Sequence, residues 1–351
     1  MTTFVGSASN AGSVDGTGTA ARLDHPSGVA VDAQGNVYIA DSGNTLVRKA
    51  TPDGLVTTIA GMKQESGPWR DGKGDQARFQ DGPSGMIMDR HRKLIVTDCD
   101  GYLVRTVSED GEVTTVAKEV ALARNENSLY GIALDKYGNA YVASIDHNTV
   151  KKVTPKGSIS VYAGYYMGRD TREGAKDESN PKAGFLAPHG LAMDGSGNLF
   201  VADSENRVIK KVSPKLKITT LAGGADPPPP PPPGEDDDVE RPDDSPPTYA
   251  EARFFRDGTG AAARFASPEG IAVDAKGNLY VTDKLNHTIR KITPSGKVTT
   301  LGGKVGASGD SGGIGTEANF SAPLGIAVSP SGEIYVADSA NNRIVKGTPV
   351  R

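Results

Sequence analysis

The sequence has little cysteine and no long apolar run. A single cysteine, Cys99, excludes an intramolecular disulfide framework and fits a reducing compartment. No apolar stretch is long enough to span a bilayer, and the first residues lack the basic region and apolar core of a secretory signal. These absences lead us to expect a soluble protein without a membrane partner, with the cytoplasm as the favoured compartment.

Basic charge is also scarce. The net charge is −4, and residues 226–248 alone carry −7, from eight acids and one base, so the rest of the chain stands near neutral at +3. Proteins that bind nucleic acid need a broad basic face for the phosphates. The composition therefore predicts no nucleic-acid partner.

Glycine and proline are abundant, with 44 and 23 residues, which favours many turns between short elements. The turns separate copies of one unit, seen first as "HPSGVAVDAQGNVYIADSGNTLVRKATPDGLVTTIAG". A repeat of this length indicates a solenoid, a propeller or an array. The copies lie at residues 25–61, 82–118, 128–164, 187–223, 267–303 and 322–351.

Each complete unit contains four short runs rich in β-branched and aromatic residues, separated by turn residues. In the first unit these runs are "GVAVD", "NVYIAD", "TLVRKAT" and "LVTTIA". Four-stranded units around an axis form a β-propeller, whereas a linear solenoid would need polar capping repeats, which the sequence lacks. The sequence therefore predicts an all-β, six-bladed propeller, with residues 1–351 in one domain.

The last unit is incomplete, because it ends without the fourth run. The chain instead opens with "MTTFVG", residues 1–6, which has the pattern of that run and is followed by a linker of the usual type. We therefore expect residues 2–5 to form the outer strand of the last blade. A ring closed in this way has no open blade edge between the termini.

The motifs resemble those of the NHL-repeat family. In the first unit they are "GVAVD" (28–32) and "VYIAD" (37–41), followed by a turn that contains asparagine. Variants of the family's Asn-His-Leu signature stand at residues 44–46, 286–288 and 341–343. The resemblance covers nearly all of the chain outside residues 225–250 and implies the same six-bladed fold.

One segment interrupts the pattern between the fourth and fifth units. Residues 227–233 are seven consecutive prolines, which favour polyproline II, and an acidic tract follows them. Such a tract cannot bury apolar area, so we expect residues 225–250 to be disordered. The segment is either a docking site for proline-recognising domains or a tolerated insertion, because long loops cost little to close.

Candidate binding residues follow from the propeller geometry that the resemblance implies. The first strand of each blade would line a central channel, and the residue before the glycine of the entry motif would lie near its mouth. These six positions are Ser27, Ser84, Tyr130, His189, Glu269 and Leu324. Together with His25, their titratable groups indicate a ligand site. The alternative is that they are exposed loop positions that vary freely.

A metal centre is the sharper alternative. The resemblance makes zinc a candidate ligand of the channel, because the peptidylglycine amidating lyases, which are six-bladed relatives, hold a metal there with several histidines. A catalytic zinc needs three protein ligands, but only His25 and His189 belong to entry segments, at different motif positions. A calcium centre would need clustered oxygens, and Glu269 alone supplies them. We therefore expect no metal and no cofactor.

Aspartates recur at the ends of the first and second runs, and we interpret them as structural, since Asp bonds nearby backbone in turns. Trp69, in a linker, is either an interface anchor or packs against its own blade.

The expected function is a monomeric binding or scaffold module that engages a protein, peptide or small-molecule ligand at the channel mouth. The alternative is a propeller enzyme, a lyase or hydrolase, with its active site at the same mouth. RNA binding occurs in some NHL domains, but it would need a basic face that this chain does not offer.

Overall fold

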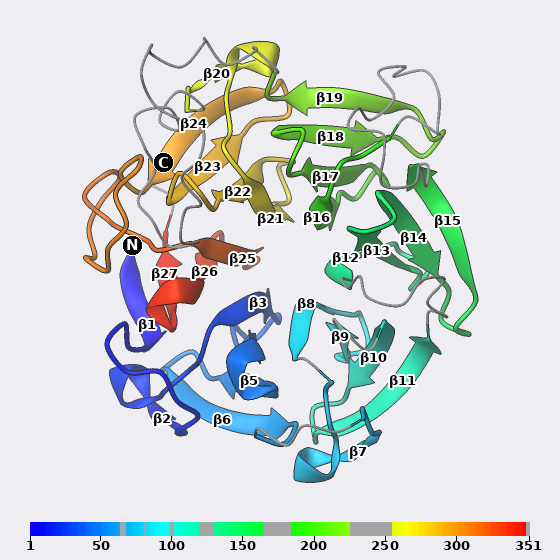
Figure 1. The fold of residues 1–351 in the computed structure, drawn as a ribbon, viewed down its shortest axis with the longest axis vertical. Coiled ribbons are helices and arrows are strands. Elements are labelled where there is room, and N and C mark those ends of the chain that lie inside the picture. Colours follow the sequence, from blue (N-terminus) through cyan, green and yellow to red (C-terminus); the bar gives the residue numbers. More distant parts are fainter. Residues whose placement is uncertain are drawn as a thin grey trace, which may run out of the picture.

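Six antiparallel sheets stand around a central axis in the computed structural model, as the blades of a propeller (Figure 1). The structure describes residues 1–63, 68–80, 82–98, 102–118, 129–164, 184–224 and 255–348. The predicted all-β, six-bladed fold is confirmed. Cys99 and the insert at residues 225–250 lie outside the described residues.

The first three blades follow one another along the chain, each from an inner to an outer strand. Blade one contains β3 (Pro26–Val31), β4 (Val37–Asp41), β5 (Leu46–Ala50) and β6 (Leu55–Ala60). Blade two contains β8 (Pro83–Met88), β9 (Leu94–Asp98), β10 (Leu103–Val107) and β11 (Glu112–Lys118). Blade three contains β12 (Leu129–Leu134), β13 (Ala140–Ser144), β14 (Thr149–Val153) and β15 (Ile159–Gly164).

The other three blades complete the ring. Blade four contains β16 (Pro188–Met193), β17 (Leu199–Asp203), β18 (Val208–Val212) and β19 (Ile218–Ala222). Blade five contains β21 (Pro268–Val273), β22 (Leu279–Asp283), β23 (Thr288–Ile292) and β24 (Lys297–Gly302). Blade six contains β25 (Pro323–Val328), β26 (Ile334–Asp338) and β27 (Arg343–Gly347).

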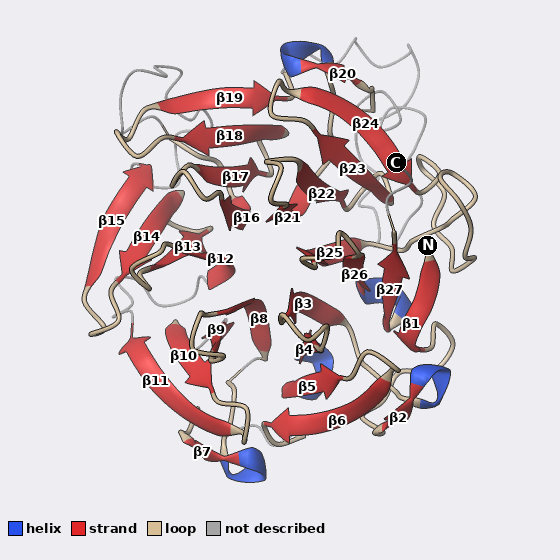
Figure 2. Ribbon diagram, turned by 180° about the vertical axis from the view of Figure 1, so that it is seen from behind, coloured by secondary structure: helices blue, strands red, loops and turns tan. Residues whose placement is uncertain are grey.

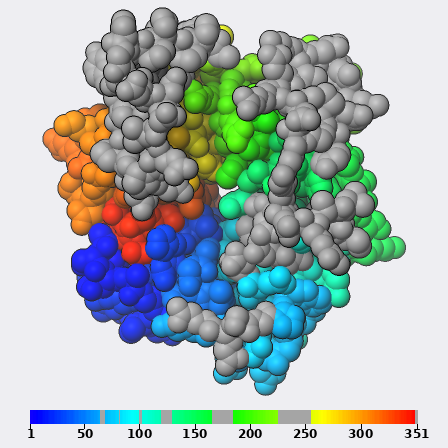
Figure 3. Space-filling model, viewed as in Figure 1, coloured from blue at the N-terminus to red at the C-terminus, as the bar shows by residue number. Residues whose placement is uncertain are grey.

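The N-terminal strand β1 (Thr2–Gly6) completes blade six. It pairs antiparallel with β27, in the sheet order β1-β27-β26-β25. Arg343 Nη1 also donates a hydrogen bond of 2.9 Å to Thr3 Oγ1. The first residues lie directly beside the last strand in the space-filling view (Figure 3). The expected closure of the ring by residues 2–5 is confirmed.

Three blades carry a short fifth strand that a plain four-stranded blade lacks. The two-residue strands β2 (Gly16–Thr17), β7 (Gly72–Lys73) and β20 (Gly258–Thr259) pair with the outer strands of blades one, two and five. Each leads into a 3-10 turn at the rim (Figure 2): η1 (Gly18–Ala20), η3 (Gly74–Gln76) and η5 (Gly260–Ala262). Two further turns follow second strands, η2 (Ser42–Asn44) and η6 (Ser339–Asn341). The linkers thus cover blade edges that would otherwise expose unpaired backbone.

The second strand ends in a buried, hydrogen-bonded aspartate in five of the six blades, and in Ser144 in blade three. Asp41 accepts the Asp24 N–H at 2.7 Å, and its other oxygen accepts hydrogen bonds from Asn44 and from Arg48 Nη1, the latter at 2.7 Å. Burial raises the pKa of Asp41 to about 6. The equivalent pairs are Asp98–Arg105, Asp203–Lys210, Asp283–Arg290 and Asp338–Arg343. These contacts agree with a structural role, since they tie the entry loop to the middle of the blade.

Trp69 packs against its own blade, with Lys118 Nζ 4.2 Å and the Arg105 guanidinium 5.9 Å from the ring centre.

Among the described residues, no helix has the length and apolar character that crossing a membrane requires.

Candidate functional site at the channel mouth

The six inner strands approach one another closely around the axis. A Cβ atom added at Gly28 would lie 1.9 Å from the Ser84 carbonyl oxygen of the next blade. The same close approach recurs around the ring at Gly85, Gly131, Gly190, Gly270 and Gly325. Glycine is required at this motif position by packing, because no other residue lets the neighbouring backbone come so near.

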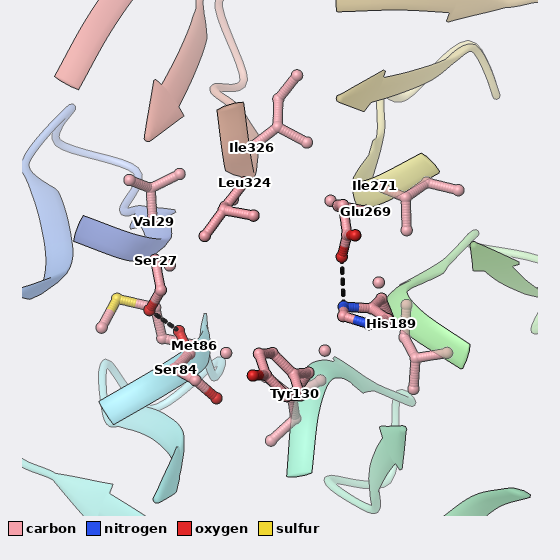
Figure 4. Close-up of a pocket in the computed structure, with 18 of the residues that line it drawn as sticks. Ser27, Val29, Ser84, Met86, Tyr130, His189, Glu269, Ile271, Leu324 and Ile326 are labelled. Atoms are coloured by element: carbon pink, nitrogen blue, oxygen red, sulfur yellow. Dashed lines mark hydrogen bonds and ion pairs between the residues drawn. The ribbon is translucent and has the colours of Figure 1, made fainter. Parts of the chain in front are cut away.

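The residues on either side of each glycine line a cavity of about 170 Å³ in the channel (Figure 4). Residues i and i+2 of a strand share a face, so each inner strand presents two side chains to the channel. The first layer contains the predicted positions Ser27, Ser84, Tyr130, His189, Glu269 and Leu324. The second layer, the apolar collar, consists of Val29, Met86, Ile132, Leu191, Ile271 and Ile326. A cavity of about 150 Å³ holds benzene, so a ring-sized group fits here.

Three of the predicted residues meet on one side of the mouth. His189 Nδ1 pairs with Glu269 Oε2, and the Tyr130 ring lies against the imidazole with ring centres 4.9 Å apart. The other Glu269 oxygen accepts a hydrogen bond of 2.9 Å from Ser267 Oγ. The three side chains come from β12, β16 and β21, in consecutive blades, and Figure 4 shows them facing one another.

This pairing sets the chemistry of the imidazole. Because Nδ1–H donates to the carboxylate, Nε2 of the neutral ring carries the lone pair. In the part of the chain that the structure describes, Nε2 has no hydrogen-bond partner. The His189 side chain is 22% exposed and that of Glu269 only 8%. The carboxylate is therefore desolvated and holds the ring in place, while the imidazole stays accessible to a ligand.

Ser27 and Ser84 lie on the other side of the mouth and are engaged with the scaffold. Ser27 Oγ is 2.5 Å from Ser42 Oγ and 3.2 Å from the Pro83 carbonyl oxygen. Ser84 Oγ donates to the Leu129 carbonyl oxygen at 2.9 Å. These hydroxyls therefore join the inner strands of neighbouring blades, in addition to lining the cavity.

Lys284 also lines the cavity, and the entry motif does not point to it. It lies in the loop between β22 and β23, which opens on the same face as the entry loops. The preceding residue, Asp283, accepts the N–H groups of Ala266 and Ser267, and burial raises its pKa. The repeat pattern predicts that the loops between second and third strands lie on the face of the mouth. It does not predict which of these loops sends a side chain into the cavity.

His25 is not among the residues that line the cavity. Its side chain is 67% exposed, and its Nδ1 lies 2.6 Å from Asp24 Oδ1. Its backbone N–H donates to Asn342 Oδ1 at 2.9 Å. The structure thus brings together Tyr130, His189 and Glu269 and places His25 outside this group.

The other histidines lie elsewhere. His147 and His287 are in loops between second and third strands, and burial lowers the pKa of both. His287 Nδ1 accepts the Ala322 N–H of the next blade at 3.1 Å. His91 is in the turn at the opposite end of its blade. Within the described residues, no three His, Cys, Asp or Glu side chains form a group that could hold a metal ion.

Comparison with known proteins identifies the repeat. The model of the NHL repeat matches residues 23–49, 265–292 and 320–346. NHL repeat-containing protein 2 of Bos taurus is 28% identical over 95% of this chain, which spans 40% of that relative. Protein SUPPRESSOR OF QUENCHING 1, chloroplastic, of Arabidopsis thaliana is 23% identical over 92% of this chain and 30% of its own length. A chloroplastic relative gives the expected cytoplasmic location no support.

Solved structures share the fold at low sequence identity. A protein of unknown function from Bacteroides thetaiotaomicron superposes with a TM-score of 0.70 at 19% identity, over 98% of this chain and 74% of the other. Virginiamycin B lyase from Staphylococcus aureus gives 0.54 at 15% identity, over 93% and 95%. A gluconolactonase from Xanthomonas campestris gives 0.52 at 13% identity, over 92% and 86%. The same architecture therefore includes proteins described as lyases and lactonases.

Proposed function

Since this chain belongs to the NHL-repeat proteins and folds as a six-bladed propeller, we propose that it is a binding module whose ligand occupies the channel mouth. The observation that carries the proposal is the meeting of Tyr130, His189 and Glu269 from three blades beside an apolar collar. A few converging polar groups in a largely apolar concavity are typical of ligand sites. In this proposal the binding unit is a monomer and a single domain. Light scattering tests the first statement, and limited proteolysis of the purified chain tests the second.

The lining suggests what the ligand carries. His189 Nε2 accepts a hydrogen bond, so the ligand supplies a hydroxyl or an N–H group. The Lys284 ammonium supplies donors and a positive charge, so the ligand also carries a carboxylate or carbonyl oxygen. The collar takes an apolar group beside them. The carboxyl end of a peptide and a small hydroxy acid both have these features.

Saturation-transfer NMR with N-acetylated amino acids and hydroxy acids tests this proposal. We expect members of the panel to bind, and Lys284→Ala to weaken them about tenfold through loss of a charge-assisted hydrogen bond. The matched control is Lys215→Ala, because Lys215 is an exposed lysine in the turn between β18 and β19, away from the mouth. The proposal is contradicted if no member of the panel binds, or if Lys284→Ala and Lys215→Ala weaken binding equally.

A propeller enzyme is the second candidate, which the His189–Glu269 pair favours. A carboxylate that holds Nδ1–H orients the imidazole so that Nε2 can remove a proton. In a lyase the proton would come from the carbon next to the bond that breaks, and in a hydrolase from the attacking water. The lyase and gluconolactonase with the same fold support this candidate by analogy.

Turnover assays separate the two candidates. Lactones and cyclic esters, including δ-gluconolactone, are incubated with the purified chain and followed by acid release and by ultraviolet absorbance. An enzyme that uses His189 as its base loses about a hundredfold or more of its rate in His189→Ala, while Lys215→Ala leaves it unchanged. Ligand binding without turnover favours the binding module.

A further inference from the structure

Five of the six blades insert an aromatic ring between themselves and the next blade. The ring stands at the second residue of the second strand, at Tyr38, Tyr141, Phe200, Tyr280 and Tyr335, and all five are buried. Each packs in the core shared with the following blade, as Tyr38 does with Phe79 and Met86 of blade two. In β9 of blade two this position is Ile95, which is only partly buried.

In three of these five blades the ring is a tyrosine whose hydroxyl bonds an aspartate, whereas Phe200 has no hydroxyl and Tyr335 donates to Glu333 Oε2 at 3.3 Å. The hydroxyl of Tyr38 donates to Asp32 Oδ2 at 3.3 Å, that of Tyr141 to Asp135 Oδ2 at 3.2 Å, and that of Tyr280 to Asp274 Oδ2 at 3.1 Å. In each case the aspartate directly follows the first strand of the same blade.

Blade two keeps the aspartate without its donor. Asp89 Oδ1 accepts the N–H groups of His91 and Lys93, both at 2.8 Å, as its counterparts do in their turns. Its Oδ2 accepts no hydrogen bond from any residue that the structure describes. This oxygen, on a partly buried residue that lines an apolar cavity, is therefore available to accept a hydrogen bond from a ligand.

A cavity of about 500 Å³ occupies the boundary between blades two and three. It opens among the turns β8–β9, β12–β13 and β14–β15, at the opposite end of the blades from the channel mouth. Its floor is apolar and consists of Met88, Ile95, Val104, Val116, Leu134 and Val153. Small-molecule sites have volumes of about 300–1,000 Å³, so this cavity has the size of a ligand site and not of a packing defect.

The rim of this cavity is cationic. Arg90, Lys93 and Lys136 line it, and all three are exposed. The acidic groups there are Asp89 and Asp135, so three cations stand against two carboxylates. The rim therefore keeps an excess of one positive charge, which favours an anionic ligand.

We infer that the cavity between blades two and three binds a hydroxyaryl carboxylate. The ring occupies the place that a tyrosine side chain has in other blades, beside Ile95, and its hydroxyl donates to Asp89 Oδ2. The carboxylate lies at the rim with Arg90, Lys93 and Lys136. This site is independent of the ligand proposed for the channel mouth.

Ile95→Tyr is the decisive variant, because it restores the ring of the other blades. Titration calorimetry of the full chain uses 3-(4-hydroxyphenyl)propionate as the probe. We expect the parent to bind the probe and Ile95→Tyr to bind it at least tenfold more weakly, with a melting temperature raised by a few degrees. Lys215→Ala, an exposed position in the turn between β18 and β19 of blade four, should bind the probe as the parent does.

The hydrogen bond to Asp89 is tested separately, with a second probe that lacks the hydroxyl, 3-phenylpropionate. The parent should prefer the hydroxylated probe by about tenfold, as expected for a bond to a charged acceptor. Asp89→Asn keeps the oxygen that supports the turn and replaces the other by a donor, so this preference should disappear. Unchanged binding to Ile95→Tyr, a lower melting temperature in that variant, or equal binding of the two probes by the parent overturns the inference.

Discussion

The His189 imidazole and the Glu269 carboxylate pair across the boundary between blades four and five. Each stands one residue before the glycine that lets the next inner strand approach, so the ring of close contacts brings the two side chains together. The apolar collar beside them excludes water from the carboxylate, which is 8% exposed. The equivalent positions in the repeat therefore bring the two side chains together, and the types of the two residues determine which interactions the pair can make.

Glu269→Gln should weaken ligands of the channel mouth about tenfold. The amide cannot hold Nδ1–H as strongly as a carboxylate does, so the imidazole loses its fixed orientation. The measurement is the dissociation constant of the best member of the ligand panel, with a thermal melt as the control for folding. An unchanged constant in a folded variant contradicts a role for the pair in binding.

Gly190→Ala should destabilise the protein by about 1–3 kcal/mol, as overpacking does. Its Cβ would lie 2.2 Å from the Glu269 carbonyl oxygen, so the inner strands of blades four and five must move apart. Gly195→Ala is the matched control, because a Cβ there meets nothing within 4 Å. Chemical denaturation of both variants gives the comparison, and equal stabilities would show that the ring of glycines is not tightly packed.

Deletion of residues 1–6 should lower the melting temperature far more than deletion of residues 227–247. The first removes β1 and leaves the edge of β27 unpaired, with Arg343 deprived of its bond to Thr3. The second removes only residues of the Pro-rich and acidic insert. Differential scanning calorimetry of the two truncated chains decides, and similar melting temperatures would mean that closure by β1 contributes little.

His287→Asn should make stability less dependent on acid. Burial lowers the pKa of His287 from 6.5, so the folded state binds fewer protons than the unfolded state, and stability falls as the pH drops through 6.5 and below. Asparagine already accepts the equivalent backbone bond at Asn148 and Asn342, at 2.8 and 2.9 Å. The variant should therefore keep the contact with Ala322 without the titrating group.

This effect is measured as the difference in unfolding free energy between variant and parent, at pH 7.5 and about pH 5.5. The difference cancels the opposite contribution of Asp41 and Asp203, whose pKa values are raised to about 6 by burial and whose folded forms gain protons in the same range. If the stability of His287→Asn relative to the parent does not increase as the pH falls, then the burial of His287 does not make the fold sensitive to acid.

Much of the fold could be predicted because it depends on local pattern. Alternating apolar residues, Gly turns and six copies of one unit define the strands, and the displaced fourth run identifies β1 as the closing strand. The fifth strands β2, β7 and β20 could not be predicted from these patterns, since a two-residue strand exists only through its partner.

The candidate site, like the fold, could be predicted from the sequence only in part. The repeat by itself determined that Tyr130, His189 and Glu269 stand at equivalent positions, because equivalent positions in a rotational repeat face one axis. Only the tertiary structure decided which of them touch, that Lys284 joins them and that His25 turns outward. It also decided that Ile95 leaves a cavity beside Asp89. Contacts between blades depend on side-chain size and direction across a boundary, and these are set only when neighbouring blades pack together.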